Sequence, residues 1–280
     1  MATGRFDWSI RSFAFALLAM AQPACSGESQ VAPLSDTAEL CDGSSSIRLS
    51  YTNAGGGPLP ESYGFTTPYG HEFFTVDGQC NYWVGRDFES GTQYGRLSSA
   101  QAKKLSQNLL YGRFAAYAEF RGEACPDAST RTLYDGKSRL SCTCSCDGPA
   151  EYRAAFESVT SVMTELWDAG QGSAPALRVL AQRVDGSVED LEGEAWPSTL
   201  QTQLGEGALE PDAPASAFSE DAGQTVEIES DVQALRAQRE QGVGGLSLVL
   251  EEEVTYRVYA RDLLPGRASQ ALRANLNSRD

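Results

Sequence analysis

The chain of 280 residues carries a formal net charge of −16, and 41% of its residues are hydrophobic. Its length suffices for one large or two ordinary globular domains, because a domain usually takes about 100–200 residues. The strongly acidic balance argues against nucleic acid or an anionic lipid surface as the main partner.

Residues 1–24 have the pattern of a secretory signal peptide. Arg5 and Arg11 give a weakly basic start, and an apolar run follows at 12–21. This run is too short for a membrane-spanning helix, which needs about 20 apolar residues, but it suits the hydrophobic region of an export signal. The sequence Ala-Met-Ala at 19–21 offers a site for ordinary signal peptidase, which would release a soluble secreted protein.

The four residues that end at Cys25, Gln-Pro-Ala-Cys, resemble the lipobox of bacterial lipoproteins. The resemblance implies cleavage before Cys25 and attachment of fatty-acyl chains such as palmitate, so that the mature protein is anchored to a membrane of the cell envelope. Ser26 follows the cysteine in place of aspartate, which implies sorting to the outer membrane in bacteria with two membranes. Residues 25–40 then form a short polar tether.

Six further cysteines, an even number, favour three disulfides in a protein outside the reducing cytosol. They are Cys41, Cys80, Cys125, Cys142, Cys144 and Cys146. On an extended strand the last three project to one face with neighbouring Cα atoms about 6.6 Å apart, at the upper end of the disulfide range. We therefore expect each of these three to pair with one of the first three, and the individual pairs stay open.

The alternative for the cysteine cluster at 142–146 is a redox-active thiol site or a thiolate metal site. Its spacing lacks the C-x-x-C pattern of zinc sites, and the chain holds a single histidine. Structural disulfides are therefore the favoured interpretation, and we assign no metal-binding residue and no cofactor.

Residues 41–184 are expected to form a disulfide-bearing α+β domain, an antiparallel sheet with two helices on one face. Asp-Gly pairs at 77–78 and 135–136 predict the turns of two hairpins. Runs of alternating apolar residues predict strands at 46–51, 72–76, 80–86, 130–134 and 139–146. The segment 177–184 is compatible with a strand or a helix, and a strand is favoured because Val179 and Val184 lie in a stretch that leads into a turn.

Apolar residues at helical spacing predict both helices of this domain. The first begins at Ser98 or Ser99, with apolar residues at Leu105, Leu109, Leu110 and Phe114. The second begins at Pro149 and ends at Gly170. Its apolar stripe consists of Tyr152, Phe156, Val159, Met163 and Leu166.

The composition changes after Val184. Residues 185–229 are interpreted as an acidic linker or loop, because the segment 185–231 holds 13 acidic residues and no lysine or arginine. A smaller helix–hairpin unit is expected at 230–264, and it must pack against another part of the chain because an isolated hairpin is marginal in water. Residues 265–280 are expected to be a C-terminal tail in the form of a frayed helix.

Aromatic residues in the first domain are the candidate binding surface. Alternation within strands would leave some of them exposed, and exposed aromatic side chains bind protein or carbohydrate partners. The residues are Tyr63, Phe65, Tyr69, Tyr82 and Trp83. The competing interpretation is that they complete a hydrophobic core under long loops.

Support for catalysis in the sequence is weak. His71 is the only histidine, and no Gly-x-Ser-x-Gly nucleophile motif accompanies it. We therefore assign no catalytic residue and expect a non-enzymatic binding or structural protein of the cell envelope, with a protein or an envelope glycan as its partner. Two alternatives stay open: an exported hydrolase that uses His71 as a base, and an exported thiol or metal protein.

Overall fold

The computed structural model describes residues 40–56, 62–86, 91–109, 117, 120, 125, 127–144, 146–169, 172–173, 176–184, 206–241, 246–250 and 254–277. These residues form a mixed α+β protein with a large antiparallel sheet, which confirms the α+β class and the antiparallel sheet expected from the sequence. Cys25 and the expected signal peptide lie outside the described residues.

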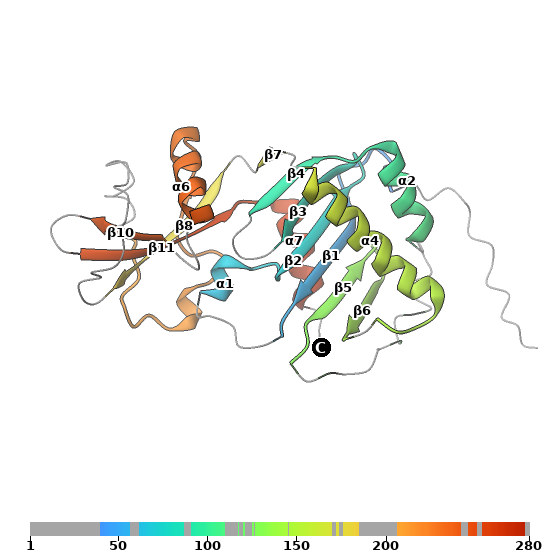
Figure 1. Cartoon of the computed structure of the whole chain (residues 1–280), viewed down its shortest axis with the longest axis horizontal. Coiled ribbons are helices and arrows are strands. Elements are labelled where there is room, and N and C mark those ends of the chain that lie inside the picture. Colours follow the sequence, from blue (N-terminus) through green and yellow to red (C-terminus); the bar gives the residue numbers. More distant parts are fainter. Residues whose placement is uncertain are drawn as a thin grey trace, which may run out of the picture. The chain divides into compact units, whose positions relative to one another are not determined.

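Seven strands make up the large sheet, in the order β6-β5-β1-β2-β3-β4-β7 (Figure 1). Each strand pairs with its neighbours in antiparallel orientation. The Asp-Gly pairs at 77–78 and 135–136 lie where β2 joins β3 and where β5 joins β6, so both predicted hairpins are confirmed. The bounds are β1 Ile47–Ala54, β2 Glu72–Asp77, β3 Asn81–Arg86, β4 Thr92–Arg96, β5 Thr130–Tyr134, β6 Arg139–Thr143 and β7 Gly172–Ser173.

Helices α2 (Ser99–Asn108) and α4 (Ala150–Asp168) begin where the sequence predicts. The Ser98 side chain accepts the backbone N–H of Gln101, and the Gln101 side chain accepts the backbone N–H of Ser98. This capping box satisfies two donors that the first helical turn leaves free. Pro149 is the N-cap residue of α4, with a φ of −50° that leads directly into the helix.

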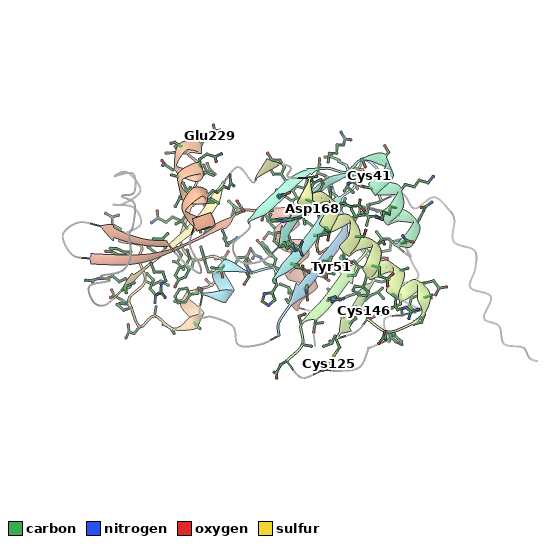
Figure 2. All side chains as sticks on the ribbon, viewed as in Figure 1. Cys41, Tyr51, Cys125, Cys146, Asp168 and Glu229 are labelled. Carbon is green, nitrogen blue, oxygen red and sulfur yellow. A yellow bond between two sulfur atoms is a disulfide. The ribbon has the colours of Figure 1, made fainter. Side chains whose placement is uncertain are left out.

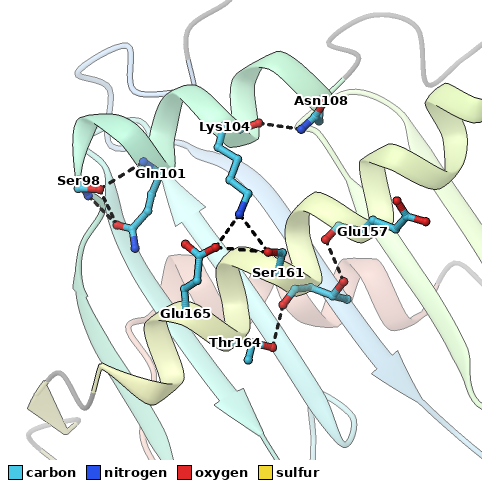
Figure 3. Close-up of polar contacts among 9 residues, drawn as sticks. Ser98, Gln101, Lys104, Asn108, Glu157, Ser161, Thr164 and Glu165 are labelled. Carbon is cyan, nitrogen blue, oxygen red and sulfur yellow. Dashed lines mark hydrogen bonds and ion pairs between the residues drawn. The ribbon is translucent and has the colours of Figure 1, made fainter.

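Side chains of α2 and α4 share one apolar core with strands of the large sheet. The two helices are also joined at their surface, because Lys104 Nζ donates to Ser161 Oγ at 3.0 Å and to Glu165 Oε1 at 2.6 Å (Figure 3). Burial of the apolar side chains is the main source of stability here. Large members of the core are Leu49, Tyr51, Phe74, Tyr82, Leu105, Leu133, Leu140, Tyr152 and Phe156.

The segment expected as a C-terminal tail contains helix α7 (Gly266–Asn277), which contacts β1, β2 and β5. Apolar residues of α7 pack with Tyr69, Phe73 and Trp83 in a second cluster. Near its end, Asn275 Nδ2 lies 3.3 Å from the carbonyl of Ser50 and 3.2 Å from that of Thr132.

A second antiparallel sheet has the order β10-β11-β8-β9. Its strand β8, which lies inside the domain expected at 41–184, pairs along its whole length with β11. Val232 and Leu235 of helix α6 pack on the apolar side chains of this sheet. The bounds are β8 Leu177–Val184, β9 Gln224–Val226, β10 Leu246–Leu250, β11 Val254–Asp262 and α6 Glu229–Gln241.

The described part of the expected acidic linker, 206–229, includes the 3-10 turn η1 (Ala215–Ala217) and β9. Phe218, which directly follows η1, is only 1% exposed and packs edge-on against Tyr259 at 5.6 Å between ring centroids. Phe65 of the short helix α1 (Tyr63–Thr66) belongs to the same cluster. A buried aromatic side chain therefore anchors this acidic stretch to β11.

Candidate functional site

All six cysteines that follow Cys25 lie in pairs at disulfide distance. The Cα–Cα separations are 5.1 Å for Cys41–Cys80, 5.8 Å for Cys125–Cys144 and 5.2 Å for Cys142–Cys146. These values fall within the usual range for bonded cysteines, about 4.4–6.8 Å. The number of pairs agrees with the three disulfides that the sequence predicts, and Figure 2 labels a member of each pair.

The expected pattern of pairing is wrong in one respect. Cys142 pairs with Cys146 inside the cluster, whereas the sequence argument assigned each clustered cysteine a distant partner. That argument assumed a strand through residue 146, but β6 ends at Thr143 and Cys144 has a left-handed φ of 64°. The chain therefore turns at Cys144, which brings Cys146 back to Cys142 and leaves Cys144 for Cys125.

The aromatic residues considered as a binding surface are buried. Phe65, Tyr69, Tyr82 and Trp83 are between 0% and 7% exposed. The Tyr63 side chain lies outside the described residues. The four described side chains therefore belong to the interior, as the competing interpretation holds, and they offer no exposed aromatic surface.

His71 lies at the entrance to β2, where Gly70 adopts a left-handed φ of 92°. A Cβ atom at Gly70 would stand 2.5 Å from the carbonyl oxygen of Asn53, so only glycine fits this close approach. The turn places His71 Nε2 at 3.2 Å from the carbonyl oxygen of Gly55. Among the described residues, no group of three or more His, Cys, Asp or Glu side chains is arranged to hold a metal ion.

A cavity of about 40 Å³ lies beside His71, where β11 ends next to the loop before β2. Its wall combines small, hydroxyl-bearing and charged residues, and it includes the buried residues Arg261 and Asp262. The complete lining is Thr66, Thr67, Pro68, Tyr69, Gly70, His71, Phe73, Gly85, Gly91, Thr92, Ala260, Arg261 and Asp262.

Asp262 is bound from two directions. Its Oδ1 atom accepts a hydrogen bond from Arg236 Nη2 of α6 at 2.6 Å, and Oδ2 accepts one from the backbone N–H of Thr92 at 2.6 Å. Both charged residues are buried, so this ion pair is shielded from water. Through these contacts, Asp262 connects β11 to the start of β4 in the large sheet.

Glu220 is the centre of a second polar cluster next to the cavity. Its Oε1 atom accepts the Tyr69 hydroxyl at 2.6 Å and the Ser269 hydroxyl at 3.3 Å. Its Oε2 atom forms an ion pair with Arg273 of α7 at 2.5 Å. Burial, followed by the hydrogen bond to Glu220, raises the pKa of the Tyr69 phenol.

Arg261 is 6% exposed and lies with its guanidinium 5.5 Å from the centre of the Phe65 ring. Its Nη2 atom donates to the backbone carbonyl of Glu220 at 2.7 Å, while Nε and Nη1 have no hydrogen-bond partner. Burial lowers the pKa of this guanidinium. The sequence argument missed Arg261 and Asp262, because charged residues at the end of a strand are ordinarily exposed.

Neither a protein-family model nor a curated protein matches the chain. Within the described residues, no helix combines the length and the apolar character that crossing a membrane requires. The geometry of the cavity and the chemistry of its side chains are therefore the basis for a functional proposal.

Proposed function

We propose that the protein is a lipid-anchored, extracytoplasmic binding protein of a bacterial cell envelope, without enzymatic activity. The observation that carries the proposal is that the six cysteines after Cys25 form three pairs among themselves. Cys25 is then the odd cysteine of seven, at the position where the lipobox-like sequence requires the acylated residue.

Disulfide pairing supports an extracytoplasmic location because glutathione and thioredoxin keep cytosolic thiols reduced. The apolar run at 12–21 and the cysteine pairs are independent features that indicate export. The anchor belongs to the outer membrane in this proposal, with a soluble secreted protein as the alternative. Residues 25–40 act as the tether between the acyl chains and the folded part.

The folded part is proposed to be an antiparallel sheet with two helices on one face, followed by a smaller helix–hairpin unit. The core shared by α2, α4 and the strands supports the first half of this description. The packing of α6 on β8 and β11 supports the second half. The partner is a component of the envelope, either a protein or a glycan.

Expression of the full chain in a bacterium tests the anchor directly. Intact-mass spectrometry is expected to find a mature chain that begins at Cys25 and carries the mass of the acyl groups. Cys25→Ser is expected to move the protein from the membrane fraction to the soluble fraction. A matched control, Cys41→Ser with Cys80→Ser, removes one disulfide pair and should leave the protein in the membrane fraction.

Thiol alkylation of the purified protein tests the extracytoplasmic half of the proposal. Without reductant the six cysteines should resist alkylation, and peptide mapping should recover the pairs Cys41–Cys80, Cys125–Cys144 and Cys142–Cys146. An unlipidated chain that retains its leader and has six reactive thiols would overturn both the location and the anchor.

An exported hydrolase is the second candidate, because the only histidine lines the cavity. Generic esterase, peptidase and glycosidase substrates distinguish the two functions. The binding function predicts no turnover by the wild-type protein or by His71→Ala. Turnover that disappears in His71→Ala and persists in a Gln79→Ala control would establish the hydrolase instead.

A further inference from the structure

Arg261 is a buried cation that interacts electrostatically with Tyr69 and Glu220 but forms no ion pair within the described part of the chain. No described carboxylate lies within ion-pair distance of its guanidinium, and two of its three nitrogen atoms lack a hydrogen-bond partner. A charge that is removed from water and left unpaired is strongly unfavourable. The contact with the face of the Phe65 ring offsets only part of this cost.

The neighbouring Asp262 does not serve as the counter-ion. Consecutive residues of a strand point to opposite sides, so Arg261 lies with Phe65 while Asp262 lies with Arg236 of α6. Both carboxylate oxygens of Asp262 are already bound, one by Arg236 and the other by the backbone of Thr92. Its negative charge is therefore balanced on the other side of β11.

Glu220 is likewise committed to other groups. Its carboxylate forms an ion pair with Arg273 and accepts hydrogen bonds from Tyr69 and Ser269. Arg261 donates a hydrogen bond to the backbone carbonyl of Glu220, and the Glu220 carboxylate attracts the guanidinium without forming an ion pair with it. Arg273 also forms an ion pair with Asp221, so Glu220 and Asp221 share this arginine, and neither carboxylate is bound directly by the Arg261 guanidinium.

Arg261 also forms part of the wall of the cavity beside His71. The cavity volume of about 40 Å³ is several times what a single water molecule needs, so a small polar group fits inside. The loop that contains Thr67 and Tyr69 also lines the cavity. An unpaired cation, free donor atoms and adjacent space are therefore present at one place.

We infer that this cavity binds the carboxylate group of a ligand, with the Arg261 guanidinium as its counter-ion. The Nε–H and Nη1–H groups of this buried guanidinium have no hydrogen-bond partner, so they supply charge-assisted hydrogen bonds to a carboxylate. A dianionic phosphate would bring two negative charges to a single guanidinium, so the site favours a monoanion. The carboxylate belongs either to a small free acid or to the C-terminus of a peptide.

This inference deepens the proposed binding function and rests on it. Its tests use the purified full chain in detergent, and they report on the cavity and not on the anchor. A negative result would remove the carboxylate site and leave acylation at Cys25 to be decided by the fractionation experiment.

Thermal unfolding in rising concentrations of sodium acetate, with chloride holding the ionic strength constant, is the first test. The unfolding midpoint of the wild-type protein should rise and then saturate, because a ligand that binds only the folded state stabilises it. Arg261→Met keeps an apolar stem of similar length and removes the charge. The acetate-dependent rise should disappear in this variant, and its midpoint in chloride should equal or exceed that of the wild type.

Arg178→Met is the matched control. Arg178 is the register partner of Arg261 on β8, donates to the carbonyls of Ala222 and Asp221, and does not line the cavity. The acetate effect should persist in this control. An effect that is absent from the wild type, or that survives in Arg261→Met, would overturn the inference.

If Arg261→Met does not fold, nuclear magnetic resonance of the wild-type protein tests whether acetate binds at Arg261. Arginine Nε–H signals of the wild-type protein are followed during an acetate titration, with Arg261→Lys used to assign the signal of Arg261. A saturable shift of that signal supports the inference, whereas unchanged signals overturn it. Stronger binding of phosphate than of acetate would overturn the preference for a monoanion.

Two short peptides separate the sources of the carboxylate. N-acetyl-dialanine with a free C-terminus is compared with its C-terminal amide and with acetate. Binding of the free peptide at least about tenfold tighter than acetate, with no binding of the amide, identifies a peptide terminus as the ligand. Equal affinity for acetate and the free peptide identifies a small free acid, and binding of the amide overturns the inference.

Discussion

The two faces of strand β1 in the large sheet differ in the polarity of their buried side chains. On β1, Leu49 and Tyr51 are buried in the apolar core that α2 and α4 share. The intervening residues Ser50 and Thr52 are equally buried but polar, and both lie within hydrogen-bond reach of Asn275 in α7. Strand β1 thus packs by apolar contacts on one face and by hydrogen bonds to Asn275 on the other.

Apolar packing and polar contacts also differ in how they hold α7 and β11. The core with α2 and α4 depends on apolar area, which is non-directional and tolerates small displacements. The contacts of α7 and β11 depend on Asn275, on the ion pair between Arg236 and Asp262, and on Glu220. Hydrogen bonds require fixed distances and angles, so these contacts specify position more strongly than they add stability.

Truncation in the apolar core is the largest expected effect. Phe74 is completely buried, and Phe74→Ala should lower the free energy of unfolding by about 4 kcal/mol because it removes apolar contacts and leaves a cavity. Chemical denaturation measures the change. Ile228→Ala is the matched control, since Ile228 is 62% exposed and its truncation should change stability by less than about 0.5 kcal/mol. Equal effects of the two substitutions would contradict the assigned core.

The second largest loss of stability is expected when one charge of the buried ion pair between Arg236 and Asp262 is removed. Asp262→Asn removes the buried carboxylate that Arg236 Nη2 contacts at 2.6 Å and should cost about 3 kcal/mol. Asp221→Asn, at a carboxylate whose side chain is 86% exposed, should cost less than about 0.5 kcal/mol. The double variant Arg236→Met with Asp262→Leu sharpens the comparison, because replacing both charges should restore most of the lost stability. A double variant as unstable as Asp262→Asn would mean that the pair itself stabilises the fold.

The contact between α7 and the large sheet should give an intermediate effect. Asn275→Ala removes the side-chain donor that reaches the carbonyls of Ser50 and Thr132, so the free energy of unfolding should fall by about 2 kcal/mol. Gln270→Ala, at an exposed position of the same helix, controls for changes in helix propensity. Calorimetry that finds the two variants equally stable would show that Asn275 does not hold α7 in place.

The burial of Tyr152 in the apolar core can be tested through the pH dependence of the free energy of unfolding. Burial raises the pKa of this phenol from 10.0 to about 12, so the folded state favours the neutral form. The corresponding stability is complete below pH 10 and is lost as the pH rises through about 12, because the unfolded chain ionises first. Tyr152→Phe also removes the hydrogen bond to the Ser141 carbonyl and should cost about 1 kcal/mol at neutral pH.

The pH profile separates these two contributions. Between pH 10 and about 12 the free energy of unfolding should fall less steeply for Tyr152→Phe than for the wild type. Denaturant titrations at several pH values measure both slopes. Parallel slopes for the two proteins would contradict the shifted pKa of Tyr152.

Elements with strong local signals could be predicted from the sequence. The apolar stripe of α4, from Tyr152 to Leu166, is buried as its spacing indicated. Ser98 caps α2, and two Asp-Gly pairs lie at hairpin turns. These signals are readable because capping, turn formation and helical periodicity involve residues that are close in the chain.

The candidate site had no comparable local signal. Arg261 and Asp262 end an apolar strand, and their partners Glu220, Thr92 and Arg236 come from a loop, from another sheet and from a helix. Distant elements also bury three of the aromatic residues, because Tyr69 and Trp83 pack with α7 and Phe65 packs with Tyr259 of β11. Burial of a polar residue depends on such distant elements, which local patterns do not encode.

The sequence by itself determined the number of cysteines available for pairing, the helix and turn signals, and a mixed α+β class with an antiparallel sheet. Only the tertiary structure decided that Cys142 pairs with Cys146, that β8 joins β11, and that Arg261 is buried beside a cavity. The physical reason is the range of the interactions. Propensity and periodicity act between neighbours in the chain, whereas pairing, burial and charge balance depend on residues that meet only after folding.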